Sequence, residues 1–318
     1  MYNPYENIEP FIEKVKYSEN IVIAGHISPD GDAISATLAL AMILEKMGKK
    51  TIMLLEKTGD VFSYIKGFDR ICTDCYENIK DVDLFISVDC GDIYRLGDVK
   101  DIFDKAKYTV NIDHHASNDS FADLNIVNIK SSSTSEIIFE IANYANILDI
   151  DIATAIYTGI VFDSGGFKFN CTTKRTHQIA GELVEMGVDT HTIHSIILSL
   201  HSLENSRLLA KAIDNIYVEN DIIISTLSKD EIEKCNATSS DTGNIVQYLL
   251  DTKNVNISVF IYEKEDVLKV SFRSKTIDVN KIASTFGGGG HILASGATIK
   301  DMTIEEAKAD ILKKIKNI

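Results

Sequence analysis

The sequence contains few prolines, glycines and cysteines and no long apolar run, and each of these absences excludes a class of protein. Only three prolines and 18 glycines occur in 318 residues, which excludes a collagen-like or low-complexity chain. No apolar run approaches the roughly 20 residues that a membrane-spanning helix needs, and the first residues carry neither the basic start nor the apolar core of a signal peptide. Five cysteines are too few and too scattered for a disulfide framework. We therefore expect a protein of the reducing cytoplasm with no membrane partner.

Basic residues are also scarce. The 32 lysines and arginines are outnumbered by 47 aspartates and glutamates, which gives a net charge of −15. A surface that grips long nucleic acid is normally basic, so this balance argues against such a protein. A small phosphate-bearing substrate held at one local site is still compatible with it.

The N-terminal half alternates short β-like runs with helical stretches. Such alternation predicts an α/β fold with a mostly parallel sheet that helices cover on both faces. Ligands of these sheets bind beyond the carboxyl ends of the strands. The predicted strands are 21–24, 51–55, 84–88 and 108–112, and the predicted helices are 33–47, a helix from Ser133, and 151–161.

The C-terminal part predicts a second, smaller α/β domain. Its β-like runs precede a charged amphipathic helix that starts at about Thr303. Between the two domains, apolar residues recur at helical spacing, which indicates a helical linker. The length fits two domains of roughly 100–200 residues each. The predicted boundaries are 1–188 for the first domain, 189–214 for the linker and 215–318 for the second domain.

Acidic residues and histidines cluster where predicted strands or helices of the first domain end. A single Asp at such a place is ordinarily a cap or turn residue, and a lone pair of histidines is ordinarily structural. Four such clusters in one α/β half instead favour a shared site, because parallel strands bring their carboxyl ends to one edge of the sheet. The clusters are His26 with Asp30 and Asp32, then Asp89, then Asp113 with His114 and His115, and finally Asp163.

The clusters contain the ligands of divalent cations. Carboxylates and imidazoles together suit ions such as Mn²⁺. So many groups oversupply one ion, whereas two ions that share a bridging carboxylate would use them. Asp30, Asp32, Asp89 and Asp163 carry four negative charges, which match two divalent cations. Two ions about 3.5–4 Å apart can clamp a phosphate and hold a hydroxide for in-line attack, so the residues predict a two-metal phosphoesterase site.

The second domain carries a glycine-rich run, Gly287 to Gly290, followed by His291. The run is not a P-loop, since no Gly-Lys-Ser/Thr follows. Four glycines let the backbone approach a ligand closely and direct N–H groups at an anion, although a flexible turn has the same composition. Arg273 either grips a phosphate through both arms of its guanidinium or is an exposed strand arginine.

Other candidates are open to two interpretations. Arg95 either touches a phosphate or contributes surface charge. Ser133, Thr134 and Ser135 stand at a predicted helix start, where capping is favoured over anion binding through backbone N–H groups. Cys72 and Cys75 have C-x-x-C spacing without a second pair, which predicts a surface loop.

The residues and their order resemble the DHH phosphoesterase family. The second domain resembles the DHH-associated C-terminal domain, and the likeness covers about 21–297. In the first domain, the matching motifs are His26-x-x-x-Asp30-x-Asp32, Asp89, Asp113-His114-His115 and Asp163. In the second domain, they are Ser271-Phe-Arg273-Ser274 and Gly287-Gly-Gly-Gly-His291-x-x-Ala294-Ser-Gly296.

The resemblance implies roles for individual residues. His115 would lie beside the reacting phosphate and orient it or protonate the leaving oxygen, which suits an imidazole near neutral pH. Asp89 would bridge the two ions and, with His115, is an expected catalytic residue. The implied ligands are His26, Asp30 and Asp89 for one ion and Asp32, Asp89, His114 and Asp163 for the other. The candidates for substrate binding are Arg273, Ser274, Gly288, Gly289, Gly290, His291 and Arg95.

The branch of the family that the two domains resemble degrades very short RNA and dephosphorylates 3′-phosphoadenosine 5′-phosphate (PAP). We therefore expect hydrolysis of short RNA or DNA oligonucleotides to nucleoside 5′-monophosphates, and of PAP to AMP. A phosphodiesterase acting on cyclic di-AMP or linear pApA would carry the same metal ligands. The glycine run disfavours an inorganic pyrophosphatase, and the intact ligand set disfavours a non-catalytic nucleotide-binding protein. A homodimer is compatible with the sequence.

Overall fold

The computed structural model describes residues 7–76, 79–199 and 201–316. The chain divides into two compact units, an N-terminal unit (1–200) and a C-terminal unit (201–318). The predicted α/β class is confirmed, because the first unit holds a five-stranded parallel sheet and the second a six-stranded mixed sheet. No helix in the described ranges is long and apolar enough to cross a membrane.

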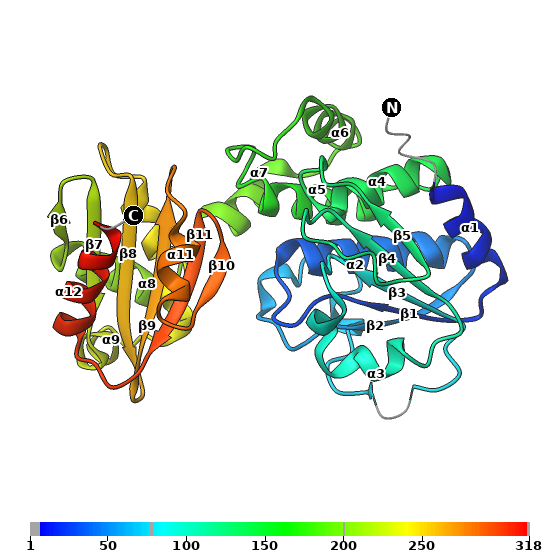
Figure 1. Ribbon diagram of the computed structural model, residues 1–318. Helices are drawn as coiled ribbons and strands as arrows, with labels where there is room; N and C mark the ends of the chain where they lie inside the picture. Colours follow the sequence, from blue (N-terminus) through cyan, green and yellow to red (C-terminus); the bar gives the residue numbers. More distant parts are fainter. Residues whose placement is uncertain (1–6, 77–78, 200, 317–318) are drawn as a thin grey trace. The chain divides into compact units, whose positions relative to one another are not determined.

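The sheet of the N-terminal unit has the strand order β2–β1–β3–β4–β5, and every pair is parallel (Figure 1). Its central strand β3 is buried at all five positions, as expected for a strand covered on both faces. One hydrophobic core lies on each face. The strands are β1 Asn20–Ala24, β2 Lys50–Leu54, β3 Leu84–Val88, β4 Thr109–Asp113 and β5 Leu124–Val127.

Helices build the larger of these two cores. Helix α2 is buried at 14 positions, which explains why its sequence is apolar nearly all round. The smaller core on the other face includes Val99 and Phe103, beside the short helix α3. The helices are α1 Ile8–Tyr17, α2 Gly31–Lys46, α3 Lys100–Phe103, α4 Thr134–Tyr144, α5 Ile150–Asp163 and α6 Lys174–Glu185, with 3-10 turns at Asp60–Phe62, Phe68–Arg70 and Ile93–Val99.

The C-terminal unit is built on a sheet of order β10–β11–β9–β8–β7–β6, in which only β7 and β8 are parallel neighbours. The strands are β6 Tyr217–Glu219, β7 Ile222–Leu227, β8 Ile257–Lys264, β9 Val267–Ser274, β10 Gly289–His291 and β11 Ala294–Ile299. The helices are α8 Leu203–Asp214, α9 Lys229–Lys234, α10 Ile245–Leu250, α11 Val279–Ser284 and α12 Ile304–Ile315, with a 3-10 turn at Ser239–Thr242.

The stretch predicted as a helical linker, 189–214, is helical but spans the division between the two units. It contains α7 (Thr190–His194), a π-helical turn (Ser195–Ser199) and α8. Ile193 belongs to the core of the N-terminal unit, whereas Leu208 belongs to a core of the C-terminal unit. A separate linker with the predicted boundaries stays a prediction.

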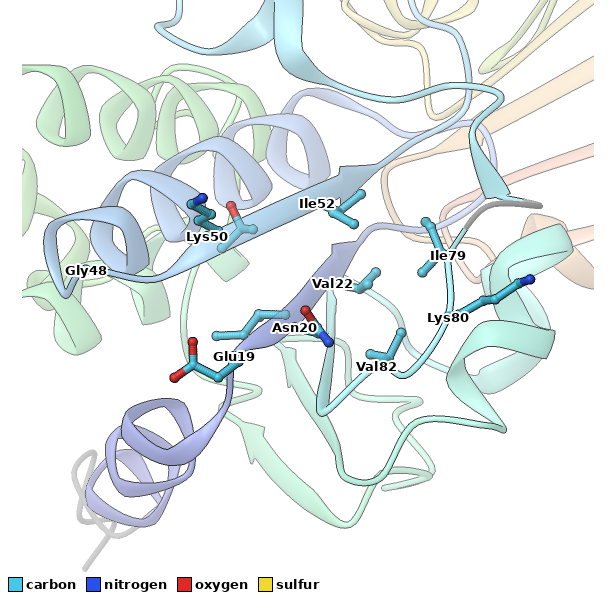
Figure 2. A pocket seen from close by; sticks show the side chains of 11 residues that line it. Glu19, Asn20, Val22, Gly48, Lys50, Ile52, Ile79, Lys80 and Val82 are labelled. Carbon is cyan, nitrogen blue, oxygen red and sulfur yellow. The ribbon is translucent and has the colours of Figure 1, made fainter.

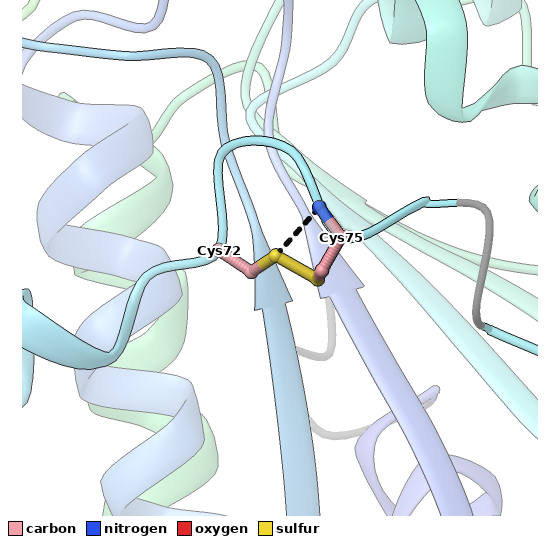
Figure 3. The surroundings of a disulfide bond; sticks show 2 residues. All are labelled: Cys72 and Cys75. Carbon is pink, nitrogen blue, oxygen red and sulfur yellow. Dashed lines mark hydrogen bonds between the residues drawn. A yellow bond between two sulfur atoms is a disulfide. The ribbon is translucent and has the colours of Figure 1, made fainter.

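The loop that follows β2 contains a disulfide bond between Cys72 and Cys75 (Figure 3). The prediction of a surface loop did not include this bond. The loop is tied to the sheet, since the Cys72 amide donates to the Met53 carbonyl and the Leu55 amide donates to the Cys72 carbonyl. The Cys75 amide also donates to the Cys72 sulfur at 3.0 Å. The cysteine count excluded a framework of several disulfides, but it could not exclude one local bond within a turn.

Helices α2, α4 and α5 meet at Gly159 of α5. A methyl group added there would lie 2.0 Å from Ser135 Oγ and 2.5 Å from Asp32 Oδ1. The glycine thus lets α5 approach the first turns of α2 and α4. Asp163 lies one helical turn further along α5 and so shares this face.

We predict that Gly159→Ala destabilises the protein, by about 1–3 kcal/mol, because the new methyl group overpacks this junction. An alanine in a helix is otherwise better than a glycine by about 0.5–1 kcal/mol. Gly181→Ala in α6 is the matched control, since a methyl group there meets nothing within 4 Å. Thermal unfolding should show a lower melting temperature for the first variant and an unchanged or higher one for the second. Equal behaviour of the two variants would contradict the packing argument.

Candidate metal centre

The four predicted clusters lie together at the carboxyl edge of the N-terminal sheet. His26 follows β1, Asp89 follows β3, and Asp113 is the last residue of β4. In the described part of the chain, three overlapping groups of possible ligand atoms each lie within 4.8 Å of one another. These groups are His26, Asp30 and Asp89; Asp32, His114 and Asp163; and Asp89, His114 and His115.

Asp89 lies between the first two groups. Its Oδ2 is 3.6 Å from His26 Nε2, and its Oδ1 is 3.6 Å from His114 Nε2. Its backbone is left-handed, with φ of 56°, a conformation that is uncommon for residues other than glycine and that clusters at functional sites. Each carboxylate oxygen therefore faces a different group of ligands, which is the arrangement that a bridging carboxylate requires.

The first turn of α4 holds the buried carboxylate of Asp32. The Thr134 amide donates to Asp32 Oδ2 at 2.6 Å and the Ser135 amide donates to Oδ1 at 3.0 Å. Ser133 caps the helix by accepting from the Glu136 amide. The start of α4 is therefore both capped by Ser133 and able to bind an anion through its backbone N–H groups. The anion that it binds is the carboxylate of Asp32.

Thr134 has a second contact that the sequence analysis missed. Its hydroxyl donates to Asp89 Oδ1 at 3.0 Å, so one residue orients both Asp32 and Asp89. The signal was the run of hydroxyl residues at a helix start, but nothing in the sequence showed that this helix start faces the strand ends.

A buried polar chain orients His115. Its Nδ1 lies 2.7 Å from Asp113 Oδ1, and this hydrogen bond raises the pKa of His115. Asn118 donates to Asp113 Oδ2 at 2.6 Å and to Asn111 Oδ1 at 2.7 Å. Because Nδ1 is engaged by Asp113, Nε2 is the nitrogen left for a substrate. The sequence analysis did not single out Asn118 and Asn111, since an isolated asparagine carries no recognisable pattern.

Carboxylates control the protonation of both His26 and His114. Burial alone would lower the pKa of His26, but the neighbouring carboxylates of Asp30 and Asp89 outweigh it and raise that pKa to about 10. Burial likewise opposes the charge on His114, while Asp163 and Asp32 raise its pKa to about 10.

Two of the carboxylates are in turn difficult to ionise. Burial raises the pKa of Asp163 to about 6. Burial and the charges of Asp163 and Asp89 also raise the pKa of Asp32. The carboxylates thus favour any positive charge placed among them, whether a proton or a metal ion.

The donor set fits divalent cations. Carboxylate oxygens and imidazole nitrogens together suit ions such as Mn²⁺. His26 Nδ1 lies 2.8 Å from the Ile27 carbonyl and His114 Nδ1 lies 3.4 Å from the Ser131 carbonyl. Nδ1 of each ring thus contacts groups outside the carboxylate cluster, and Nε2 is the nitrogen that faces the carboxylates, as is usual for metal-binding histidines.

Arg95 reaches the rim of this centre. Its Nη2 lies 2.9 Å from His26 Nδ1, although the residue is exposed. The sequence left open whether Arg95 contacts a phosphate or only contributes surface charge. Its position beside His26 is compatible with a phosphate contact.

The substrate-binding candidates of the C-terminal unit fall on two faces of its sheet. Arg273 of β9 pairs with Ala294 of β11, which in turn pairs with His291 of β10, so all three share one face. Ser274 follows on the opposite face, where it is buried and its hydroxyl accepts from the Thr276 and Ile277 amides. The structure therefore does not bring Ser274 together with Arg273.

The glycines of the run 287–290 differ in how much space surrounds their Cα atoms. A methyl group on Gly288 would lie 2.1 Å from the Gly296 carbonyl, and one on Gly290 would lie 2.6 Å from the Ala294 carbonyl. Both positions therefore need glycine for close strand approach. Gly289 has more space, since a methyl group there would lie 3.9 Å from its nearest neighbour, Asn280 Oδ1.

A cavity of about 630 Å³ lies elsewhere in the N-terminal unit (Figure 2). Asn20 and Lys50, the first residues of β1 and β2, both line it. It is therefore at the amino ends of these strands, whereas the acidic clusters lie at the carboxyl ends. None of the residues proposed for chemistry lines this cavity.

We predict that Asp89→Asn lowers the affinity for Mn²⁺ at least about 100-fold, because it neutralises the carboxylate shared by both ligand groups. The amide keeps the shape of the side chain and tolerates a left-handed backbone. Isothermal titration calorimetry on protein treated with a chelator measures the change. Asp101→Asn, at an exposed position of α3, is the control. Tight binding by the Asp89 variant would remove this residue from the ligand set.

The stability of metal-free protein should fall as the pH rises from about 7 to 10. The folded pKa of about 10 for His26 and His114 lies above the ordinary value of 6.5. The stability from these protons is therefore complete below pH 6.5 and is lost as the pH approaches 10. Melting temperatures with a chelator should show this fall, and His26→Gln should weaken it, whereas His191→Gln at an exposed position should not. The same slope in wild type and His26→Gln would contradict the assignment.

Comparisons with known proteins agree with this geometry. Residues 20–160 match the model of the DHH family, N-terminal domain, and residues 219–318 match that of the DHHA1 domain. The bifunctional oligoribonuclease and PAP phosphatase NrnA of Bacillus subtilis (strain 168) is 30% identical, over 91% of this chain and 92% of that protein. The bifunctional oligoribonuclease and PAP phosphatase NrnA of Thermus thermophilus is 26% identical, over 98% of this chain and 94% of that protein.

A solved structure shows the same fold over nearly all of the chain. It is the crystal structure of an exopolyphosphatase-related protein from Bacteroides fragilis, which is 29% identical and superposes with a TM-score of 0.90. The match covers 97% of this chain and 94% of that one. With relatives of this identity and coverage, and with both domain models matched, the chain belongs to the DHH family of phosphoesterases.

Proposed function

We propose that this protein hydrolyses short oligonucleotides to nucleoside 5′-monophosphates and removes the 3′-phosphate of PAP. The observation that carries the proposal is Asp89, which turns one carboxylate oxygen toward each of two ligand groups. The names of the relatives, which describe an oligoribonuclease and a PAP phosphatase, support the same substrates.

The site would hold two divalent cations, with Mn²⁺ favoured by its imidazoles. Asp89 would serve both ions. Four carboxylates balance the charge of two such cations, which would supply the Lewis acidity that clamps a phosphate and makes water nucleophilic at neutral pH. The remaining ligands would be His26 and Asp30 on one side and Asp32, His114 and Asp163 on the other.

His115 would act on the substrate and not on a metal ion. Its Nδ1 is engaged by Asp113, and about a third of the side chain is exposed. The hydrogen bond with Asp113 raises the pKa of His115 and so favours its protonated form. Nε2 can then donate to a phosphate oxygen or give its proton to the leaving oxygen.

The C-terminal unit would bind a phosphate of the nucleotide substrate. Arg273 forms no ion pair with a carboxylate among the described residues, and burial lowers its pKa. An arginine that is desolvated without a counter-ion favours an anionic ligand, and its planar guanidinium matches phosphate geometry. Gly289 and His291 lie on the same face of the sheet as Arg273.

A substrate panel tests the proposal. With Mn²⁺ present, we predict cleavage of RNA dinucleotides to pentanucleotides and of PAP, and little cleavage of 10-nucleotide RNA or pyrophosphate. His115→Asn should lower kcat at least about 100-fold while metal binding persists, because general acid catalysis typically contributes 10²–10⁴-fold. His177→Asn, which lies outside the metal centre on α6, is the control.

Three results would redirect the proposal. Cleavage of cyclic di-AMP or linear pApA with no cleavage of other short RNAs would identify a dinucleotide phosphodiesterase. Cleavage of pyrophosphate alone would identify a pyrophosphatase and would contradict the inference that the glycine run binds a nucleotide. An unchanged kcat in His115→Asn would exclude a role for that residue in proton transfer.

A further inference from the structure

The sheet of the C-terminal unit is covered unequally on its two faces. One face packs against α11 and α12 across its width, with Leu268, Val270 and Phe272 of β9 in that core. On the other face, α8 and α10 cover β7 and β8, where Phe260 is buried. The part of this second face formed by β9, β11 and β10 carries small and polar side chains, and none of them is buried.

The pairing of the strands identifies which residues share this open face. Tyr262 of β8 pairs with Lys269 of β9, which pairs with Thr298 of β11. The next row of the same face holds Ser271 and Gly296. Because these two residues are small, they leave a cavity of about 350 Å³. Tyr262, Lys269, Ser271, Gly288, Gly296 and Thr298 line it.

This open face carries basic side chains, Lys269 and Arg273, in a chain whose net charge is −15. No aspartate or glutamate lies on it within the strands β8 to β11. Lys269 Nζ donates to Thr298 Oγ1 at 2.8 Å, and in the described ranges Lys269 forms no ion pair with a carboxylate. Two cations, Lys269 and Arg273, are thus presented on one strand without counter-ions, which is complementary to a polyanion.

The two cations are too far apart to contact one phosphate group. Lys269 and Arg273 are four residues apart on β9, which corresponds to about 13 Å. Beside Lys269 stands the half-buried ring of Tyr262, which stacks on Phe260 with ring centroids 5.5 Å apart. A fixed aromatic ring next to an unpaired cation is the pairing that binds a base and its phosphate in single-stranded nucleic acid.

We propose that Lys269, Tyr262 and Thr298 form a second nucleotide subsite, which binds a further nucleotide of a short single-stranded oligonucleotide. The inference rests on the proposed function and deepens it. The Arg273 region binds the nucleotide common to all substrates, and the Lys269 subsite is used only by longer ones. The subsite thus extends binding to trinucleotides and longer chains without contributing to PAP.

The test compares substrates of different length on single variants of the full chain. Lys269→Gln should raise KM for a trinucleotide and a pentanucleotide RNA about threefold to fivefold, and leave KM for PAP unchanged. It should also make the negative slope of log(kcat/KM) against log[salt] shallower by about 0.7 for the pentanucleotide, because one phosphate contact is lost. Tyr262→Leu should raise KM for the same RNAs about fivefold or more, whereas Tyr262→Phe, which keeps the ring, should not. Lys313→Gln on α12, at an exposed position over the opposite face, is the matched control.

Outcomes separate this inference from the proposed function. Equal effects of Lys269→Gln on PAP and RNA, or no effect on either, would overturn the subsite and leave the proposed function standing. A fluorescein-labelled pentanucleotide bound to chelator-treated protein gives a readout that needs no turnover. Binding that depends on Lys269 without any cleavage would support the subsite and contradict the proposed function. Binding that ignores Lys269 would overturn the subsite.

Discussion

The burial of several carboxylates beside one another is the constraint on which the acidic site of the N-terminal unit depends. Asp32, Asp89 and Asp163 lie close together at the edge of the sheet, the first two buried and the third half-buried. Backbone amides of α4, the Thr134 hydroxyl and two imidazoles compensate part of their charge. Burial raises the pKa of Asp163 and Asp32 in spite of these partners, so the site still favours added positive charge. The negative charge of these carboxylates is thus only partly compensated by the protein, and divalent cations are suited to neutralise the remainder.

Most of the catalytic half could be predicted from its sequence. A short apolar run that ends in an acidic residue predicts both a strand and the edge at which its carboxyl end lies. Asp89 after 84–88 and Asp113 after 108–112 follow this rule, and the structure brings them to one edge. The rule works because the parallel pairing of neighbouring strands is enough to bring the residues at their carboxyl ends close together.

The residues that escaped prediction are those whose partners lie across helices. Thr134 meets Asp32 across 102 residues of sequence, and Gly159 meets Ser135 because α5 packs on α4. Neither contact follows from local spacing. Ser274 differs from these residues, because it stands next to Arg273 in a motif but its side chain faces the other side of the same strand. Period-two alternation within a strand would have separated the two.

The left-handed backbone of Asp89 has a consequence for how this position is studied. Its φ of 56° suits glycine, asparagine and aspartate far better than other residues. Alanine scanning here would combine the loss of a charged group with a backbone penalty, and the measured effect would overstate the role of the carboxylate. The same conformation limits which residue types can replace Asp89 among relatives. Low sequence variability at this position would therefore reflect the backbone as well as the chemistry of the site.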